Sequence, residues 1–292
     1  MKQGDAVPMD PDMNRKPAVP DLPPPLVLPA GADPDMAFLL DALRLQPAFD
    51  AGPQLLRRKL FDRVARSAAA GRAMVTVRLA DARVSRPAPG VEWRQLYAAQ
   101  GAGLRRGEPR AAHWIELAPG ATWSGGWPAC TDRREWLVVR GSVIVGDVAL
   151  DALDYHVVPA GAAIERIASD VGATLYLREA PAPDSERQST TDYSAAAWAD
   201  FAPGIKRRVL WTRGSEAAML YHALPGAAVP RHGHGHDEEC LMLDGELFLD
   251  EILLRTGEYQ LAPAGSEHGG LMTDTGAVIY AHGDLDLAVI GA

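Results

Sequence analysis

Residues 226–245 read GAAVPRHGHGHDEECLMLDG, and residues 257–268 read GEYQLAPAGSEH. Side chains alternate between the two faces of an extended strand, so His232 and His234 offer two imidazoles to one target. Glu238 reaches the same target if the chain turns after His234, and His268 from a distant strand completes the set. Imidazole and carboxylate are common ligands of divalent transition metals. We therefore predict a metal site made of these four residues.

Both segments resemble the two signature motifs of the cupin superfamily, G-x5-H-x-H-x3-E-x6-G and G-x5-P-x-G-x2-H, in residue type and spacing. Only the family's final Asn is replaced, by Met272, at a supporting position. The resemblance implies a small antiparallel barrel, or jelly roll, with one divalent metal near its middle. The alternative is a flexible histidine-rich surface loop with incidental metal affinity, in which His268 is an ordinary turn residue.

The chain repeats itself beyond residue 72, where short β-branched and aromatic runs between Gly and Pro are typical of an all-β fold. Residues 89–97 (PGVEWRQLY) parallel residues 203–211 (PGIKRRVLW) at an offset of 114. Residues 135–141 (EWLVVRG) parallel residues 239–245 (ECLMLDG) at an offset of 104, because the first copy has longer loops at 101–112 and 123–133. A repeat of about 100 residues has the size of a whole small domain.

We therefore predict an all-β fold with two cupin barrels in tandem, related by a pseudo-twofold axis. A metal-free barrel occupies residues 73–183 and a metal-binding barrel occupies residues 184–292, with a polar linker at 180–193. Residues 1–35, rich in Pro and Asp, are predicted to form a disordered tail. Residues 36–72 have apolar residues at helical spacing and predict two short amphipathic helices.

The first copy lacks the metal ligands. Gly126 and Pro128 stand at the two histidine positions of the first motif, and Ile164 stands at the position of the last histidine. His113 and His156 fall away from ligand positions and are interpreted as ordinary strand residues. We predict that the first barrel is structural or holds an apolar ligand.

The same comparison distinguishes two adjacent glutamates. Glu135 of the first copy aligns with Glu239, which we expect to serve the fold as a hydrogen-bond partner at a strand edge. Glu238 is then the ligand, and its counterpart in the first copy is Arg134, whose charge would repel a cation.

Other residues near the motifs have weaker signals. His236 falls in the tight turn between two ligands, where a solvated side chain is expected. Cys240 lies two residues after Glu238 and either points into the barrel or is a small buried residue, the favoured interpretation. Tyr259 and Glu267 are candidates for a catalytic acid or base only because they lie close to the motif in sequence.

Composition excludes several classes of protein. The 292 residues include 29 Lys and Arg against 38 Asp and Glu, a net charge of −9 that does not favour nucleic acid as a partner. The two cysteines, Cys130 and Cys240, provide neither a disulfide framework nor a cysteine-rich zinc finger. No signal-peptide pattern occurs, and no apolar run approaches the ~20 residues of a membrane span. We predict a cytoplasmic protein that binds neither nucleic acid nor a membrane.

Within the cupins, residues 230–251 and 257–268 are most similar to ChrR-like cupins, the C-terminal part of a type of zinc-dependent anti-sigma factor. The resemblance extends back to residues 53–64 (PQLLRRKLFDRV) and implies zinc bound by two His, a Glu and a third His, here His232, His234, Glu238 and His268. The anti-sigma module of that family binds a separate zinc through a His and paired cysteines. Residues 1–60 contain neither His nor Cys, so zinc-dependent sigma-factor binding is not supported.

The ligand set leaves two classes of function open. We predict one divalent metal ion, with Zn favoured over Fe, Mn, Ni or Cu, in a regulatory, sensory or small-molecule-binding protein. The alternative is a non-haem metal-dependent dioxygenase or isomerase acting on a small organic substrate. The basic residues of segment 36–72 are either solvated, which is favoured, or contact a regulatory protein partner. A homodimer is expected because sheet edges of such barrels often pair across a twofold axis.

Overall fold

The computed structural model describes residues 57–61, 74–100, 103–105, 107–126, 131–181, 187–194 and 197–290. The predicted tail at 1–35 lies outside these residues, and of the predicted helical segment only a short helix at 57–61 is described. The chain divides into two compact units, Met1–Arg63 and Val64–Ala292, and all described strands belong to the second. No helix in the described part of the chain is long and apolar enough to cross a membrane.

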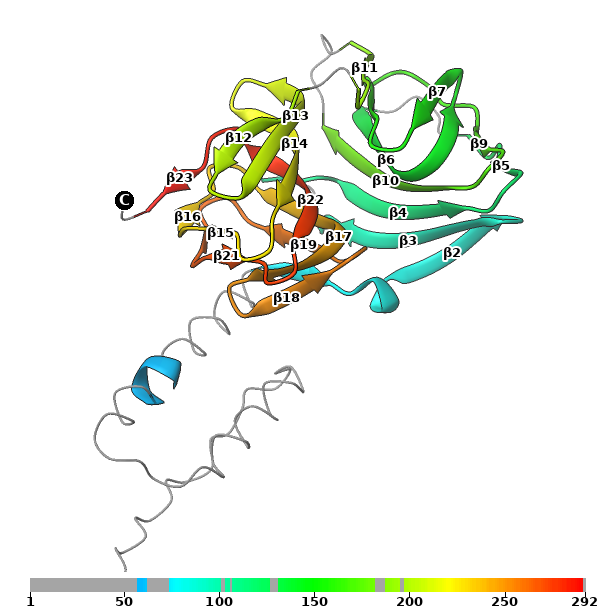
Figure 1. Ribbon diagram of the computed structural model, residues 1–292. Coiled ribbons are helices and arrows are strands. Elements are labelled where there is room, and N and C mark those ends of the chain that lie inside the picture. Colours follow the sequence, from blue (N-terminus) through cyan, green and yellow to red (C-terminus); the bar gives the residue numbers. More distant parts are fainter. Residues whose placement is uncertain are drawn as a thin grey trace, which may run out of the picture. The chain divides into compact units, whose positions relative to one another are not determined.

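The second unit is built almost entirely of strands, which form two barrels (Figure 1). The first barrel contains β2 (Arg83–Ala88), β3 (Val91–Ala98), β4 (Ala111–Leu117), β5 (Ala121–Trp123), β6 (Asp132–Val145), β7 (Val148–Asp151), β8 (Tyr155–Val158), β9 (Ile167–Ser169) and β10 (Ala173–Pro181). The second contains β12 (Ala199–Ala202), β13 (Ile205–Arg213), β14 (Glu216–Ala223), β15 (Ala228–Val229), β16 (His232–Gly233), β17 (Glu238–Leu249), β18 (Ile252–Arg255), β19 (Tyr259–Ala262), β20 (Glu267–His268), β21 (Leu271–Met272) and β22 (Ala277–Asp284). The predicted all-β tandem is confirmed.

The two barrels have the same topology. Their large sheets run β11-β8-β6-β10-β4-β3-β2 and β1-β19-β17-β22-β14-β13-β12, so the strands correspond one to one. In each barrel a long strand, β6 or β17, also pairs with the strands of the opposite wall. These long strands bend at Gly141 and Gly245, which have positive φ and lie so close to the next strand that a Cβ would lie 2.0 and 2.2 Å from a carbonyl oxygen.

The barrels exchange their first strands. β1 (Val75–Val77), followed by the 3-10 turn η1 (Leu79–Asp81), precedes the first barrel but pairs with β19 of the second. β11 (Ser189–Thr191) precedes the second barrel but pairs with β8 of the first. The pairing therefore crosses the predicted boundary between residues 183 and 184 in both directions, and that division of the chain stays a prediction.

Strand alternation creates three hydrophobic cores. Side chains of β6 and β17 that point inward fill each barrel, as Trp136 and Val138 do in the first and Cys240 and Met242 do in the second. The alternate side chains, such as Leu137 and Leu241, join a third core that contains residues of both barrels. The barrels are therefore held together by a continuous packed interface as well as by strand exchange.

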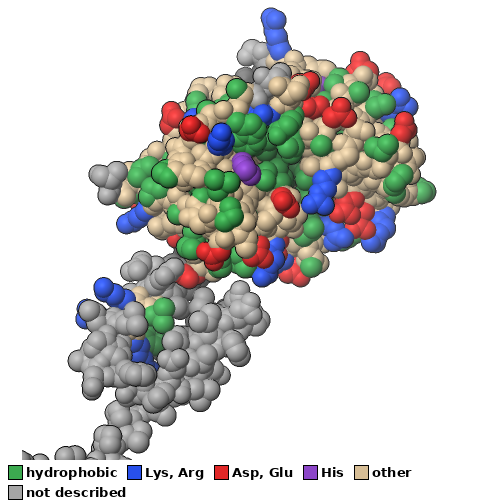
Figure 2. All heavy atoms as spheres, in the orientation of Figure 1, with side chains coloured by type: hydrophobic (Ala, Val, Ile, Leu, Met, Phe, Trp, Pro, Cys, Tyr) green, Lys and Arg blue, Asp and Glu red, His purple; other side chains and the backbone are tan. Residues whose placement is uncertain are grey.

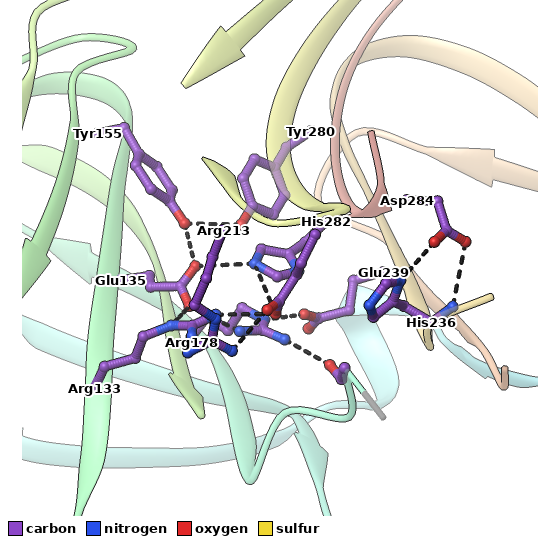
Figure 3. Close-up of polar contacts among 12 residues, drawn as sticks. Arg133, Glu135, Tyr155, Arg178, Arg213, His236, Glu239, Tyr280, His282 and Asp284 are labelled. Carbon is purple, nitrogen blue, oxygen red and sulfur yellow. Dashed lines mark hydrogen bonds and ion pairs between the residues drawn. The ribbon is translucent and has the colours of Figure 1, made fainter. Parts of the chain in front are cut away.

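The interface core contains a network of buried charges (Figure 3). Arg178 donates through Nη1 to Glu135 Oε1 at 2.7 Å and through Nε to Glu239. Glu239 Oε1 also accepts from Tyr176 at 2.8 Å and Tyr259 at 2.7 Å. All of these side chains are buried, so the carboxylates and the guanidinium compensate one another out of contact with water.

The network follows the pseudo-twofold relation between the barrels. Glu135 and Glu239 are equivalent at the offset of 104, and so are Tyr176 and Tyr280, whose ring centroids lie 5.1 Å apart. The symmetry is broken where Arg178 corresponds to His282, whose Nε2 lies 3.3 Å from Glu135 Oε2.

On the surface that Figure 2 shows, acidic and basic side chains are mixed around a hydrophobic patch.

Replacing Arg178 by Met should destabilise the protein by about 3–5 kcal/mol, because two buried carboxylates lose their shared cation. Chemical denaturation of the mutant against the wild type measures the change. Arg166→Met, at an exposed position of the same barrel, is the control. An unfolding free energy equal to that of the control would show that the network does not stabilise the interface.

Candidate metal centre

Backbone pairing brings the predicted ligands together in the second barrel. β16 pairs with β20 so that His232 lies opposite His268, and it also pairs with β23 (Ala288–Val289). After His234 the chain turns and enters β17 at Glu238, whose neighbours in register belong to β19. The two motifs, which are separate in sequence, therefore meet at one place because β17 and β19 are adjacent strands.

The four side chains converge. Ligand atoms of His232, His234 and Glu238 all lie within 4.8 Å of one another. His268 adjoins them, with its ring centroid 5.5 Å from that of His232 and 5.0 Å from that of His234. The three imidazoles are buried, and Glu238 is half-buried. The arrangement agrees with the prediction, while the assignment of the four residues as ligands stays a proposal.

Burial and the Glu238 carboxylate govern the charges of this cluster. Burial raises the pKa of Glu238, but His234 and the other two imidazoles overcome this effect and hold it at about 2. Burial lowers the pKa of His232. Burial also opposes charge on His234, but the adjacent Glu238, whose Oε2 lies 2.9 Å from His234 Nδ1, raises the pKa of this imidazole overall. At neutral pH the cluster thus contains an ionised carboxylate, which favours a bound cation.

Two of the imidazoles are oriented by neighbours that sequence reasoning did not identify. His232 Nδ1 lies 2.9 Å from the carbonyl oxygen of Pro230, so it donates its proton there and leaves Nε2 free to accept. His268 Nδ1 lies 3.5 Å from Asp250 Oδ2, a charge contact and not a hydrogen bond, and Asp250 accepts from the Gly269 N–H at 2.6 Å. Such outer partners fix the tautomer and direction of metal-bound histidines.

The residues fit a divalent metal. Within the described part of the chain, His234 Nε2 is buried and has no hydrogen-bond partner. A buried polar atom is rarely left without a partner, and a metal would satisfy it. Three imidazoles and one carboxylate are donors that zinc and neighbouring transition metals accept. His232, His234, Glu238 and His268 are therefore the residues that would hold the ion.

The prediction for His236 is wrong. Its side chain is buried rather than solvated, with 5% of the residue exposed, and its Nδ1 lies 2.5 Å from Asp284 Oδ1 (Figure 3). Asp284 also accepts from the backbone N–H groups of Gly235 and His236. A turn residue is expected to be solvated only if nothing packs on the turn, and here the end of β22 does.

Glu239 serves the fold as predicted, but its location was predicted wrongly. β17 is flanked by β19 and β22, so Glu239 lies in the centre of a sheet and not at an edge. It points into the interface core, on the face of β17 opposite to Glu238. Tyr259 is also buried in that network, and Glu267 is exposed and paired with Arg231. Neither of these two lines the cavity beside the cluster.

A cavity of about 60 Å³ adjoins the cluster inside the second barrel. His232, Glu238 and His268 form part of its wall, and most of the remainder is apolar, contributed by β12 to β15, β17, β21 and β22. No Lys or Arg of the described residues lines it. Cys240 is buried, as favoured from sequence, and also lines this cavity, so both interpretations of this residue hold.

The first barrel has a different interior at the equivalent place. Ile164 is part of its hydrophobic core, and Gly126 lies beside it, since a Cβ on Gly126 would be 3.6 Å from the Ile164 carbonyl oxygen. Pro128 lies outside the described residues. Arg134, at the position of Glu238, is buried and lies 3.3 Å from both Glu179 Oε1 and the Ala162 carbonyl oxygen. This interior is therefore packed with apolar side chains and has a cation where the second barrel has its carboxylate.

Comparison with known proteins identifies the same part of the chain. Residues 186–286 match the family model of the ChrR Cupin-like domain. No curated protein matches the chain.

Solved structures match both barrels together. A protein from Nostoc punctiforme PCC 73102, named a "putative dioxygenase", has a TM-score of 0.58 at 18% identity, over 76% of this chain and 86% of that one. Oxalate decarboxylase from Bacillus subtilis, in a deletion mutant, has a TM-score of 0.54 at 13% identity, over 73% of this chain and 76% of that one. At these identities the matches show the fold alone.

Cys240 should be unreactive in the folded protein. Burial raises the pKa of its thiol, and nearby Glu238 raises it further, so the thiolate needed for reaction is scarce. In a Cys130→Ser background, a thiol reagent at pH 8 should label the native protein far more slowly than the protein in guanidinium chloride. Equal rates would mean that the cavity is open to the reagent and the thiol is ionised.

Proposed function

We propose that the chain, whose second barrel matches the ChrR Cupin-like domain, binds one divalent metal ion, most readily zinc, through His232, His234, Glu238 and His268. The observation that carries this proposal is the convergence of these side chains, with a buried His234 Nε2 that lacks a partner among the described residues. The apolar core and Arg134 of the first barrel support a single site per chain.

We propose further that the metal takes part in sensing or binding a small organic molecule. The cavity beside the cluster is apolar and has no Lys or Arg in its described lining, which favours an uncharged ligand over a carboxylate. Burial raises the pKa of both Tyr221 and Cys240, the other titratable groups in the wall, so neither is a base at neutral pH. Apart from the proposed metal ligands, the described wall has no proton acceptor, which supports binding more than proton-transfer chemistry.

The second candidate is a metal-dependent dioxygenase or isomerase. It is favoured by one observation, that the cavity reaches His232, Glu238 and His268, so a molecule within it would lie beside the metal. A bound divalent ion supplies Lewis-acid polarisation or, for iron, redox chemistry. The chain's own residues would exclude water from the cavity and orient the substrate.

Partners and location remain proposals of the same kind. A cytoplasmic homodimer that binds a small molecule, and neither nucleic acid nor a membrane, agrees with the composition. A regulatory protein partner for segment 36–72 would contact residues that lie largely outside the described part of the chain.

Replacing His232 and His268 together by Ala should abolish stoichiometric metal binding, because two of four ligands are lost. Elemental analysis of protein purified without an affinity tag measures the metal and also identifies it. His222→Ala, an exposed histidine on β14 of the same barrel, is the control. Stoichiometric metal in the double mutant would overturn the assignment of the site.

An uncharged ketone of three to five carbon atoms should perturb the visible absorption of the Co²⁺-substituted protein more strongly than oxalate does at the same concentration. The reason is that the described wall has no Lys or Arg, so the negative charge of a bound carboxylate would be balanced by the metal alone. The spectrum of the Co²⁺ protein without added ligand provides the baseline, and the double mutant of His232 and His268 mixed with Co²⁺ reports any signal that does not come from the site. A stronger response to oxalate would contradict an apolar ligand class, and oxygen uptake by the iron form with such a ketone would favour the enzyme.

A further inference from the structure

A loop of the metal-free barrel is much longer than its counterpart in the metal-binding barrel. β3 ends at Ala98 and β4 begins at Ala111, so twelve residues join them, whereas Gly214 and Ser215 alone join β13 to β14. The strands on either side correspond between the two barrels, so the extra length belongs to this connection. The first barrel therefore has a long connection between β3 and β4 that the second barrel lacks at the equivalent place.

This loop contacts the turn that carries the candidate ligands. Arg105 Nε lies 2.9 Å from Asp237 Oδ2, and Arg105 Nη2 lies 2.7 Å from the same oxygen. Asp237 is fully buried, and its Oδ1 accepts from the Ala264 N–H at 2.8 Å. Asp237 directly precedes Glu238, so Arg105 restrains the backbone one residue before the carboxylate ligand.

Gly107 lies against the same turn. A Cβ at this position would be 3.0 Å from His236 Cβ and 3.1 Å from Asp237 N, and its φ is +84°. Its carbonyl oxygen accepts from Arg178 Nη2 at 2.7 Å, and Arg178 also binds Glu239. The residues before and after Glu238 are thus each paired with an arginine of the first barrel.

The loop is itself held in place. Glu108 is buried and accepts from the Arg105 N–H at 2.7 Å and from the Tyr97 hydroxyl. Tyr97 belongs to β3, so these bonds connect the loop to the sheet of the first barrel. A loop that is fixed to the sheet in this way can hold the turn that it contacts in one position.

We infer that the long loop of the metal-free barrel positions the metal-binding turn, and that Arg105, through Asp237, is a positioning residue for Glu238. The inference rests on the proposed metal site and deepens it by giving the first barrel a role in that site. Without Arg105, Asp237 keeps only the Ala264 N–H among the described residues, and the turn is free to shift. A carboxylate ligand displaced by a fraction of an ångström binds its ion less tightly.

The test compares the full-length Arg105→Gln and Arg110→Gln proteins. Both arginines lie in the same loop with similar exposure of the side chain, 46% and 48%, but Arg110 pairs with Asp132 of its own barrel. The dissociation constant of Zn²⁺, measured by competition with a chromophoric chelator, should rise roughly 10-fold for Arg105→Gln and less than about twofold for Arg110→Gln. Arg105→Lys, which keeps the charge, should fall between the wild type and Arg105→Gln.

A second pair of variants does not depend on charge. Gly107→Ala, which would meet His236 and Asp237, should weaken Zn²⁺ binding, whereas Gly103→Ala, with open space around its Cβ, should not. The Co²⁺ spectrum should change for Arg105→Gln and Gly107→Ala only, and the thermal midpoint of metal-free Arg105→Gln should match that of metal-free Arg110→Gln.

The outcomes separate the two proposals. A wild type that binds no Zn²⁺ would overturn the proposed function, and the inference with it. A wild type that binds Zn²⁺, with Arg105→Gln indistinguishable from Arg110→Gln in affinity and Co²⁺ spectrum, would overturn the inference alone. If metal-free Arg105→Gln also unfolds at a clearly lower temperature than metal-free Arg110→Gln, the weaker Zn²⁺ binding would reflect general destabilisation, and the inference would be overturned.

Discussion

The buried pairing of Arg178 with Glu135 and Glu239 is the contact on which the two-barrel body depends. Each of these charges would cost several kcal/mol to bury alone. Glu135 also pairs with Arg133, but Arg178 is the one cation that the described residues offer to Glu239. The tyrosines around the pair supply the remaining hydrogen bonds, which a buried carboxylate needs to stay ionised. The interface is consequently specific in register as well as tightly packed.

Alternation along one strand connects this interface to the candidate metal centre. On β17, Glu238 and Cys240 face the interior of the second barrel, and Glu239 and Leu241 face the first barrel. Any shift of β17 by one residue would exchange the two sets and place Glu238 in the interface. Fixing Glu239 with Arg178 therefore also fixes which way Glu238 points.

Much of this arrangement was predictable from sequence because it depends on spacing and repetition. The two motifs predict the barrel, and the offsets of 114 and 104 predict its duplication and place Gly126 and Ile164 at the positions of two candidate ligands. Contacts between segments far apart in sequence were not predictable in this way. Asp250 and Asp284 carry no local signal of their contacts with His268 and His236, since the partners are 18 and 48 residues away.

The exchange of β1 and β11 was missed for the same reason. Each is only three residues long, and its pairing partner lies in the other barrel. A strand of three residues is too short to show an alternating hydrophobic pattern, so its sequence does not reveal which sheet edge it will pair with. The length of the first copy's loops was visible in the sequence. The residues that these loops contact were not, because these contacts depend on how the two barrels face each other.

Divergence of the two copies makes their facing surfaces complementary in charge. At the offset of 104, Arg133, Arg134 and Arg178 of the first copy correspond to Asp237, Glu238 and His282 of the second. Two identical copies would bring like charges together across the axis, whereas the diverged copies set arginines of one against acids of the other. The first copy has Arg134 where the second has the candidate ligand Glu238, and the neighbouring charge differences make the barrels complementary. The first barrel therefore contributes to the candidate metal centre, since the acids on either side of Glu238 find their cations, among the described residues, in that barrel.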